Sequence, residues 1–185
     1  MPTANLLPNS DISNSPAWTL STGSDIHVLL ADDHTGNPLA DGSQITTTSS
    51  GTICIVGFTD FDNTDVASID SVQGVLKIGL RARGEDFQIG MAISNNGSGA
   101  ADWAEEVQYD TASAGWMTKI FTARTTSTSG GSAWTDTDLD NIAMKIHAYA
   151  LSGNTLRATY AYFIVTYTEV GAAVADNATF FGANF

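Results

Sequence analysis

Apolar and polar residues alternate one by one along several stretches, and this period of two constrains the fold more than any other feature. In GVLKIGLRARG (residues 74–84) the even positions from 76 to 82 are apolar, while the odd positions from 77 to 83 carry glycine or a base. In IAMKIHAYAL (residues 142–151) large apolar residues alternate with Lys145, His147 and Tyr149. Such alternation is typical of strands that bury one face.

Strand-like segments follow one another along the whole chain, with turn residues between them and no long helical pattern. We count about nine or ten of them at spacings near 8–12 residues, which is the rhythm of a sandwich or jelly roll. The sequence therefore predicts an all-β fold, an antiparallel β-sandwich that is jelly-roll-like. Within it, residues 25–31 are expected to form a strand, and residues 74–84 and 86–94 are expected to form a hairpin around Gly84 and Glu85. The single cysteine, Cys54, lies in an apolar run and is expected to be buried.

The acidic segment WTDTDLDN (residues 134–141) is the one place where a short helical turn is expected, near residues 136–141. Thr135 is followed three residues later by Asp138, which is the pattern of a capping box. Leu139 and Ile142 would then point from one face of the turn into the core. The alternative, a calcium loop, requires a glycine after the third ligand position and a closing acid, and neither follows here.

The chain divides into three parts by composition. Residues 1–16 are expected to form an N-terminal arm, residues 17–170 the sandwich, and residues 171–185 a C-terminal tail. The tail holds Phe180, Phe181 and Phe185 among small residues. It either docks on a neighbouring subunit or folds back on its own sandwich, and both alternatives stay open. If it is an inter-subunit arm, deleting it should leave a folded sandwich that assembles poorly.

The net charge of the chain limits the kinds of partner that it can bind. Seven basic residues stand against 20 acidic ones, a formal net charge of -13. Because phosphate binding needs clustered Lys and Arg, a nucleic-acid partner is not expected. No stretch approaches the ~20 apolar residues of a membrane span, so no membrane partner is expected either.

Acidic residues could instead attract a divalent cation. Asp60, Asp62 and Asp65 lie close together in a loop segment, DFDNTD, and are the calcium candidates. A solvated turn is the alternative explanation of the same residues. Apart from this possible calcium, no cofactor is expected.

The sequence offers no catalytic motif. The three histidines lack metal-ligand spacing, and neither a nucleophile elbow nor a phosphate-binding glycine loop occurs. Glu105 and Glu106 could form a catalytic carboxylate pair, but a solvated strand edge is the preferred interpretation of these residues. The protein is therefore expected not to be an enzyme.

Aromatic residues suggest a different activity. Trp103, Tyr109 and Trp116 bracket one segment and could line a glycan-binding groove, because exposed rings stack on sugars. The alternative is that the tryptophans simply fill the core or form a lid over one end of the sandwich, as expected for Trp18 and Trp134.

Two stretches together resemble small β-sandwich structural proteins of tailed bacteriophages. The opening LLPNSDISNSPAWTLSTGSDIHVLLADD has a Pro-Asn segment, a tryptophan strand and an Asp-rich loop. The close, from WTDTDLDN to the last strand with its Val165-Thr166-Tyr167, has their acidic turn and final strand. The resemblance implies a non-enzymatic virion protein, above all a capsid-surface decoration (cement) protein that bridges capsid subunits. No catalytic residue is carried over with it.

This resemblance also implies which partners the protein binds and where it is located. The partners would be the major capsid protein or other virion proteins and further copies of the chain, as a homo-oligomer such as a trimer. The net charge favours the exterior surface of the virion, away from packaged DNA, after synthesis in the host cytoplasm. Two alternatives stay open: a carbohydrate-binding or host-attachment domain of a fibre or tail, and a filament or surface-layer subunit.

Overall fold

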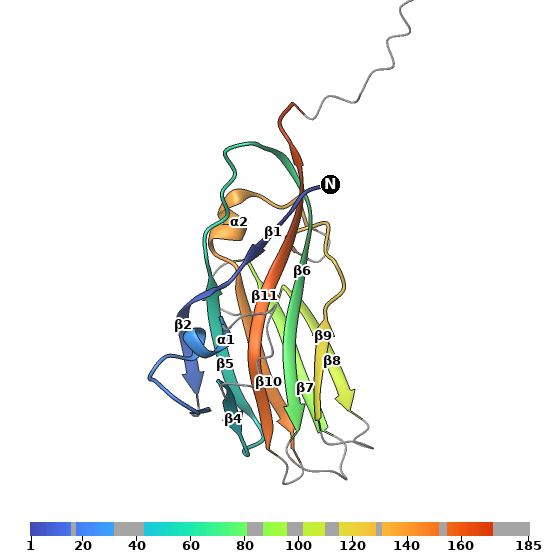
Figure 1. Cartoon of the computed structure of the whole chain (residues 1–185). Coiled ribbons are helices and arrows are strands. Elements are labelled where there is room, and N and C mark those ends of the chain that lie inside the picture. Colours follow the sequence, from blue (N-terminus) through green and yellow to red (C-terminus); the bar gives the residue numbers. More distant parts are fainter. Residues whose placement is uncertain are drawn as a thin grey trace, which may run out of the picture.

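In the computed structural model two antiparallel sheets pack face to face (Figure 1). The structure describes residues 1–15, 18–31, 43–80, 87–95, 102–109, 115–128, 131–151 and 155–171. Sheet A consists of β1 (Thr3–Leu6), β3 (Thr19–Leu20), β4 (Ile45–Thr47), β6 (Val66–Leu80), β9 (Gly115–Ile120) and β11 (Leu156–Glu169). Sheet B consists of β2 (Pro8–Ser15), β5 (Thr52–Phe58), β7 (Phe87–Ser94), β8 (Trp103–Tyr109) and β10 (Ala143–Ala150).

The strand order is that of a jelly roll. Sheet A runs β3-β4-β11-β6-β9, with β1 also paired to β11, and sheet B runs β2-β5-β10-β7-β8. From β4 onward the chain fills the orders β4-β11-β6-β9 and β5-β10-β7-β8, the two four-stranded sheets of a jelly roll. The predicted all-β, jelly-roll-like sandwich is thus confirmed.

The core lies between the sheets and follows the predicted alternation. Leu76 and Ile78 of β6 and Ile146 of β10 are completely buried. Phe58 of β5 meets Phe163 of β11 edge to face, with ring centroids 4.6 Å apart. The alternate residues of β6 and β10 therefore form the outer faces of the sandwich. Cys54 is also completely buried, as predicted.

Residues 25–31 differ from the prediction, which was wrong. They hold a short helix, α1 (Ile26–Leu30), in place of a strand. Ile26, Leu29 and Leu30 are buried, whereas Val28 is 59% exposed. This is the spacing of one helical face, and a run this short does not distinguish it from strand periodicity.

Two other expectations also change. The hairpin around Gly84 and Glu85 is wrong, because β6 belongs to sheet A and β7 to sheet B. The segment expected as an N-terminal arm enters both sheets over residues 1–15, since β1 pairs with β11 and β2 pairs with β5. Alternation alone does not say which sheet a strand joins.

The short helix near residues 136–141 is confirmed as α2 (Asp136–Asp140), which lies at the upper end of the sandwich in Figure 1. The Thr135 hydroxyl accepts a hydrogen bond from the Asp138 N–H at 3.2 Å. In return, the Thr135 N–H donates to the Asp138 carboxylate at 2.9 Å. Leu139 and Ile142 are buried as expected. This capping box fixes where the chain leaves the loop and enters β10.

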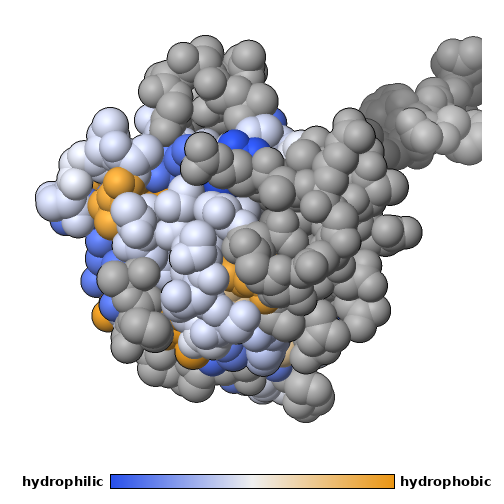
Figure 2. Space-filling model, turned by 90° about the horizontal axis from the view of Figure 1, so that it is seen from below, coloured by the Kyte–Doolittle hydropathy of each residue, from blue (hydrophilic) through white to orange (hydrophobic). Residues whose placement is uncertain are grey.

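The opposite end of the sandwich is seen in Figure 2. Its coloured surface is mostly white or blue, with a few small and separate orange areas, so the coloured part of this end presents no broad apolar patch. Among the helices of the described residues, none is long and apolar enough to cross a membrane.

Candidate functional site

The outer face of sheet A gathers aromatic and basic side chains from three neighbouring strands. Since Leu76 and Ile78 point into the core, Lys77 and Gly79 of β6 point outward. Strand register places residues of β9, β6 and β11 side by side in rows across the sheet. One row is Trp116, Gly79 and Arg157, and the next is Thr118, Lys77 and Tyr160. We call the group Trp116, Thr118, Lys77, Arg157, Tyr160 and Tyr162 the aromatic face.

A break in register on β11 brings two of these side chains to the same side. The pairing of β11 with β6 shifts between Ala158 and Tyr160, which leaves Thr159 as an extra residue. The Thr159 hydroxyl donates to the carbonyl of Ser43 at 2.7 Å and is completely buried. Because of this bulge, Arg157 and Tyr160 lie in consecutive rows of one face although three positions separate them.

Trp116 is half-buried and its ring leans over β6. A Cβ built on Gly79 would lie 2.9 Å from both Cδ2 and Cε3 of the indole, so the ring rests against the strand at a position where only glycine leaves room. The guanidinium carbon of Arg157 lies 4.7 Å from the Trp116 ring centroid, within cation–π range. These two contacts place the ring against β6 on the outer face of sheet A.

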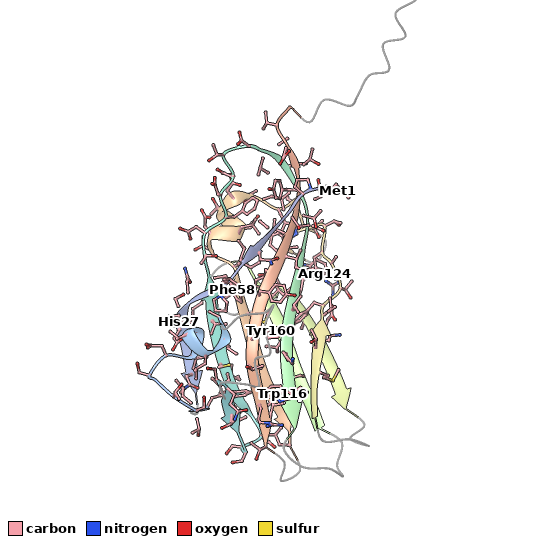
Figure 3. The ribbon with its side chains drawn as sticks, viewed as in Figure 1. Met1, His27, Phe58, Trp116, Arg124 and Tyr160 are labelled. Carbon is pink, nitrogen blue, oxygen red and sulfur yellow. The ribbon has the colours of Figure 1, made fainter. Side chains whose placement is uncertain are left out.

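Tyr160 and Tyr162 continue the face along β11 (Figure 3 labels Trp116 and Tyr160). The Lys77 amine lies 5.5 Å from the Tyr160 ring centroid, and the Tyr160 hydroxyl lies 3.3 Å from the Thr118 hydroxyl. Tyr160 is 8% exposed, while Tyr162 is half-buried, and their ring centroids are 6.0 Å apart. Burial, together with the neighbouring Tyr160, raises the pKa of Tyr162. Its phenol therefore stays protonated at neutral pH and is a hydrogen-bond donor.

Trp103, the first of the predicted glycan-binding residues, lies in a different place. It is on β8 of sheet B, packs against the core, and donates its ring N–H to the carbonyl of Thr126 at 3.1 Å. The guanidinium carbon of Arg124 lies 4.3 Å from its ring centroid. Trp103 and Trp116 therefore do not lie together on one face. The side chain of the third candidate, Tyr109, lies outside the described residues.

Glu105, two residues after Trp103, ties β8 to the β9 side of sheet A. Its carboxylate lies 3.1 Å from the Lys119 amine and 3.0 Å from the Arg124 guanidinium, and it accepts the Thr122 N–H at 2.8 Å. Burial acts to raise the pKa of Glu105, but the hydrogen bonds from Thr122 and Lys119 outweigh it and hold this pKa below its usual value. The charged carboxylate of Glu105, paired with two bases, thus holds the edges of sheets A and B together. The side chain of Glu106, its partner in the weighed carboxylate pair, lies outside the described residues.

The calcium candidates line one pocket of about 400 Å³ beside β1 and β11: Asp60, Asp62 and Asp65. The Asp62 carboxylate, however, accepts hydrogen bonds from the N–H and the hydroxyl of Thr64, at 3.1 and 2.6 Å, and these lower its pKa. Within the part of the chain that the structure describes, no group of three or more acidic, histidine or cysteine side chains is arranged to hold a metal. Calcium stays a prediction for this loop.

The partner-binding phenylalanines Phe180, Phe181 and Phe185 lie outside the described residues, as does the tail from residue 172 onward. Conversely, five residues of the aromatic face were not predicted as site residues: Lys77, Thr118, Arg157, Tyr160 and Tyr162. The alternation of β6 places Lys77 outward and could have found it. Because Thr159 is an extra residue, counting alternate positions would place Arg157 and Tyr160 on opposite faces, although both lie on the outer face.

Comparison with known proteins adds no family assignment. No family model and no curated protein matches the chain. Among solved structures, an arabinose-bound GH51 α-L-arabinofuranosidase is 14% identical with a TM-score of 0.45, covering 88% of this chain and 26% of that one. A CBM36 domain of a xylanase from the hindgut metagenome of Trinervitermes trinervoides is 11% identical with a TM-score of 0.39, covering 91% of this chain and 100% of that one. The CBM32 of AlyQ, in complex with 4,5-unsaturated mannuronic acid, is 12% identical with a TM-score of 0.32, covering 86% of this chain and 100% of that one.

The chain thus spans about a quarter of the length of the arabinofuranosidase. With such identities and TM-scores these likenesses carry no argument about function. No observation tests the capsid-decoration role, its partners or its place on the virion, and these stay predictions from the sequence.

Proposed function

We propose that the protein is a non-catalytic carbohydrate-binding domain and that the aromatic face of sheet A is its binding surface. The observation that carries this proposal is the group of outward-facing rings on β9 and β11, in which Trp116 is held over Gly79 and beside Arg157. Sugar rings present flat C–H faces that stack on aromatic rings, and a ring that is already fixed loses little entropy when it binds.

Polar groups lie among the rings, as sugar recognition requires. The hydroxyls of Thr118, Tyr160 and Tyr162 and the basic groups of Lys77 and Arg157 can all bond to sugar hydroxyls. Trp116 and Tyr162 keep exposed surface, whereas the more deeply buried Tyr160 supports Lys77 and Tyr162 from beneath. Stacking of a ring on the ligand thus falls to Trp116 and Tyr162, while the polar groups supply hydrogen bonds.

The shape of the surface favours a chain over a single sugar. The described residues of the face lie on three adjacent strands of one sheet, and neither the pocket of about 400 Å³ at the acidic loop nor the pocket of about 230 Å³ lined by Asn9, Ile12 and Asp140 includes any of them. Several rings spread over the strands of one sheet suit consecutive sugar units of a polysaccharide, each adding a weak contact.

Affinity gel electrophoresis against a panel of soluble polysaccharides tests the proposal. The unmodified protein should be retarded by at least one polymer, and Trp116→Ala should weaken that retardation about tenfold or more, as expected for a tryptophan at the centre of a binding surface.

Tyr149→Ala is the matched control. Tyr149 is 43% exposed, stacks on His147 and lies on the outer face of sheet B, so its loss should leave binding unchanged. The proposal fails if no polymer retards the protein, or if Trp116→Ala is folded and binds as the unmodified protein does.

A further inference from the structure

We infer that the ligand of the aromatic face is an anionic polysaccharide, one that carries carboxylate or sulfate groups. This inference rests on the carbohydrate-binding function proposed above and names the class of its ligand. It is argued from the distribution of charge over the described residues.

The few basic residues are not spread evenly. Five of the seven lie in the described part of the chain: Lys77, Lys119, Arg124, Lys145 and Arg157. Lys119 and Arg124 are both bound to Glu105 at the sheet edge. Lys77 and Arg157 lie in adjacent rows of the aromatic face. Two of the five described bases therefore stand on this one surface.

Acidic residues avoid the same surface. Over the described residues, the outward positions of β9, of β6 from Gln73 to Gly79 and of β11 from Arg157 to Thr166 carry no Asp or Glu. Asp70, further along β6, accepts hydrogen bonds from Ser68 and Thr168. No ion pair joins Lys77 to a carboxylate in the described part of the chain. On a chain with a net charge of -13, the described outward positions of this face thus carry two bases, Lys77 and Arg157, and no acid.

The chemistry of the two bases fits an anion on a sugar. A guanidinium binds a carboxylate or sulfate through paired N–H groups, and a lysine amine adds a point charge. The overall negative charge acts at longer range and is screened beyond about 8 Å at physiological ionic strength, so contact at the face is decided by the local charge. Negative charge elsewhere repels the polymer from other surfaces and directs it to this one.

Two pairs of polymers separate the charge of the ligand from its sugar chain. One pair is polygalacturonate and its fully methyl-esterified form, and the other is dextran sulfate and dextran. In each pair only the anionic group differs, so the first tests carboxylate and the second tests sulfate. We expect at least one anionic polymer to bind about fivefold or more tightly than its neutral counterpart.

Lys77→Gln should lower affinity for that anionic polymer by roughly threefold to fivefold and leave binding of the neutral counterpart unchanged. Lys77→Arg should keep the preference, because it keeps the charge. Lys145→Gln, on the outer face of sheet B, is the matched control and should behave as the unmodified protein does.

Equal affinity within both pairs, or a folded Lys77→Gln that keeps the preference, would overturn the anionic class. If Trp116→Ala still abolished binding in that case, the carbohydrate-binding function itself would stand. Failure of all four polymers to bind would count against both proposals.

Discussion

The ring of Trp116 rests on Gly79, the residue opposite it on the neighbouring strand, so closely that a Cβ on the glycine would lie 2.9 Å from two ring atoms. The carbonyl oxygen of Gly115 stands at the same distance from that Cβ. A side chain at position 79 therefore has to displace the tryptophan or the edge strand. The proposed binding surface depends on this glycine.

Gly79→Ala should move the Trp116 ring and weaken polysaccharide binding about fivefold or more, and it should also lower stability, because the new Cβ meets the backbone oxygen of Gly115 as well as the ring. Tryptophan fluorescence and affinity electrophoresis measure the two effects. Gly115→Ala is the control, since a Cβ there would meet nothing within 4 Å. Binding by Gly79→Ala equal to that of the unmodified protein would contradict the idea that a fixed ring is needed.

The fold was predictable where alternation is long and regular. β10 buries alternate side chains from Met144 to Ala148, and in β6 Leu76 and Ile78 are buried on either side of Lys77. The hydroxyl-to-acid spacing from Thr135 to Asp138 identified α2 and its cap. The fold was not predictable where the sequence pattern is short or local. The segment of α1 is only five residues long, and the N–H groups of Ile26 and His27 at its start donate to Asp11 of β2, a partner that local periodicity does not reveal.

The candidate site was predictable only in part. Trp116 was singled out from composition, but its intended partner Trp103 packs into the opposite sheet, because sequence proximity does not determine which sheet a strand joins. Arg157 and Tyr160 reach the face through a bulge, which no periodicity reveals. A surface assembled from three strands depends on register, and register is set by tertiary contacts.

The cap of α2 offers a test of local stability. Thr135→Ala removes both the hydroxyl that accepts the Asp138 N–H and its bond to the Asp138 carboxylate, and should cost about 1 kcal/mol, or a Tm about 2–4 °C lower. Urea denaturation followed by circular dichroism measures this loss. Thr137→Ala, at an exposed position of the same helix, should change stability by less than about 0.5 kcal/mol. Equal effects of the two substitutions would argue against the capping box as the source.

The thiol of Cys54 should be inert in the folded protein. Burial, with the charge of Asp11, raises its pKa well above the usual range, so at pH 8 it is neither accessible nor ionised. Ellman's reagent should find no reactive thiol in the native protein and one per chain in urea. Rapid reaction of the native protein would mean that β5 and β10 separate readily.

Glu105 should make stability depend on pH in a defined direction. Its folded pKa is held below the usual value, so its contribution is fully present above about pH 5 and is lost as pH falls through the folded pKa. Glu105→Gln leaves Lys119 and Arg124 without their shared carboxylate and should cost about 2 kcal/mol at pH 7. The difference in free energy of unfolding between the two proteins, measured by urea titration from pH 7 to pH 3, should shrink toward acid. A difference that is constant over this range would mean that packing of the side chain, and not its charge, joins β8 to β9.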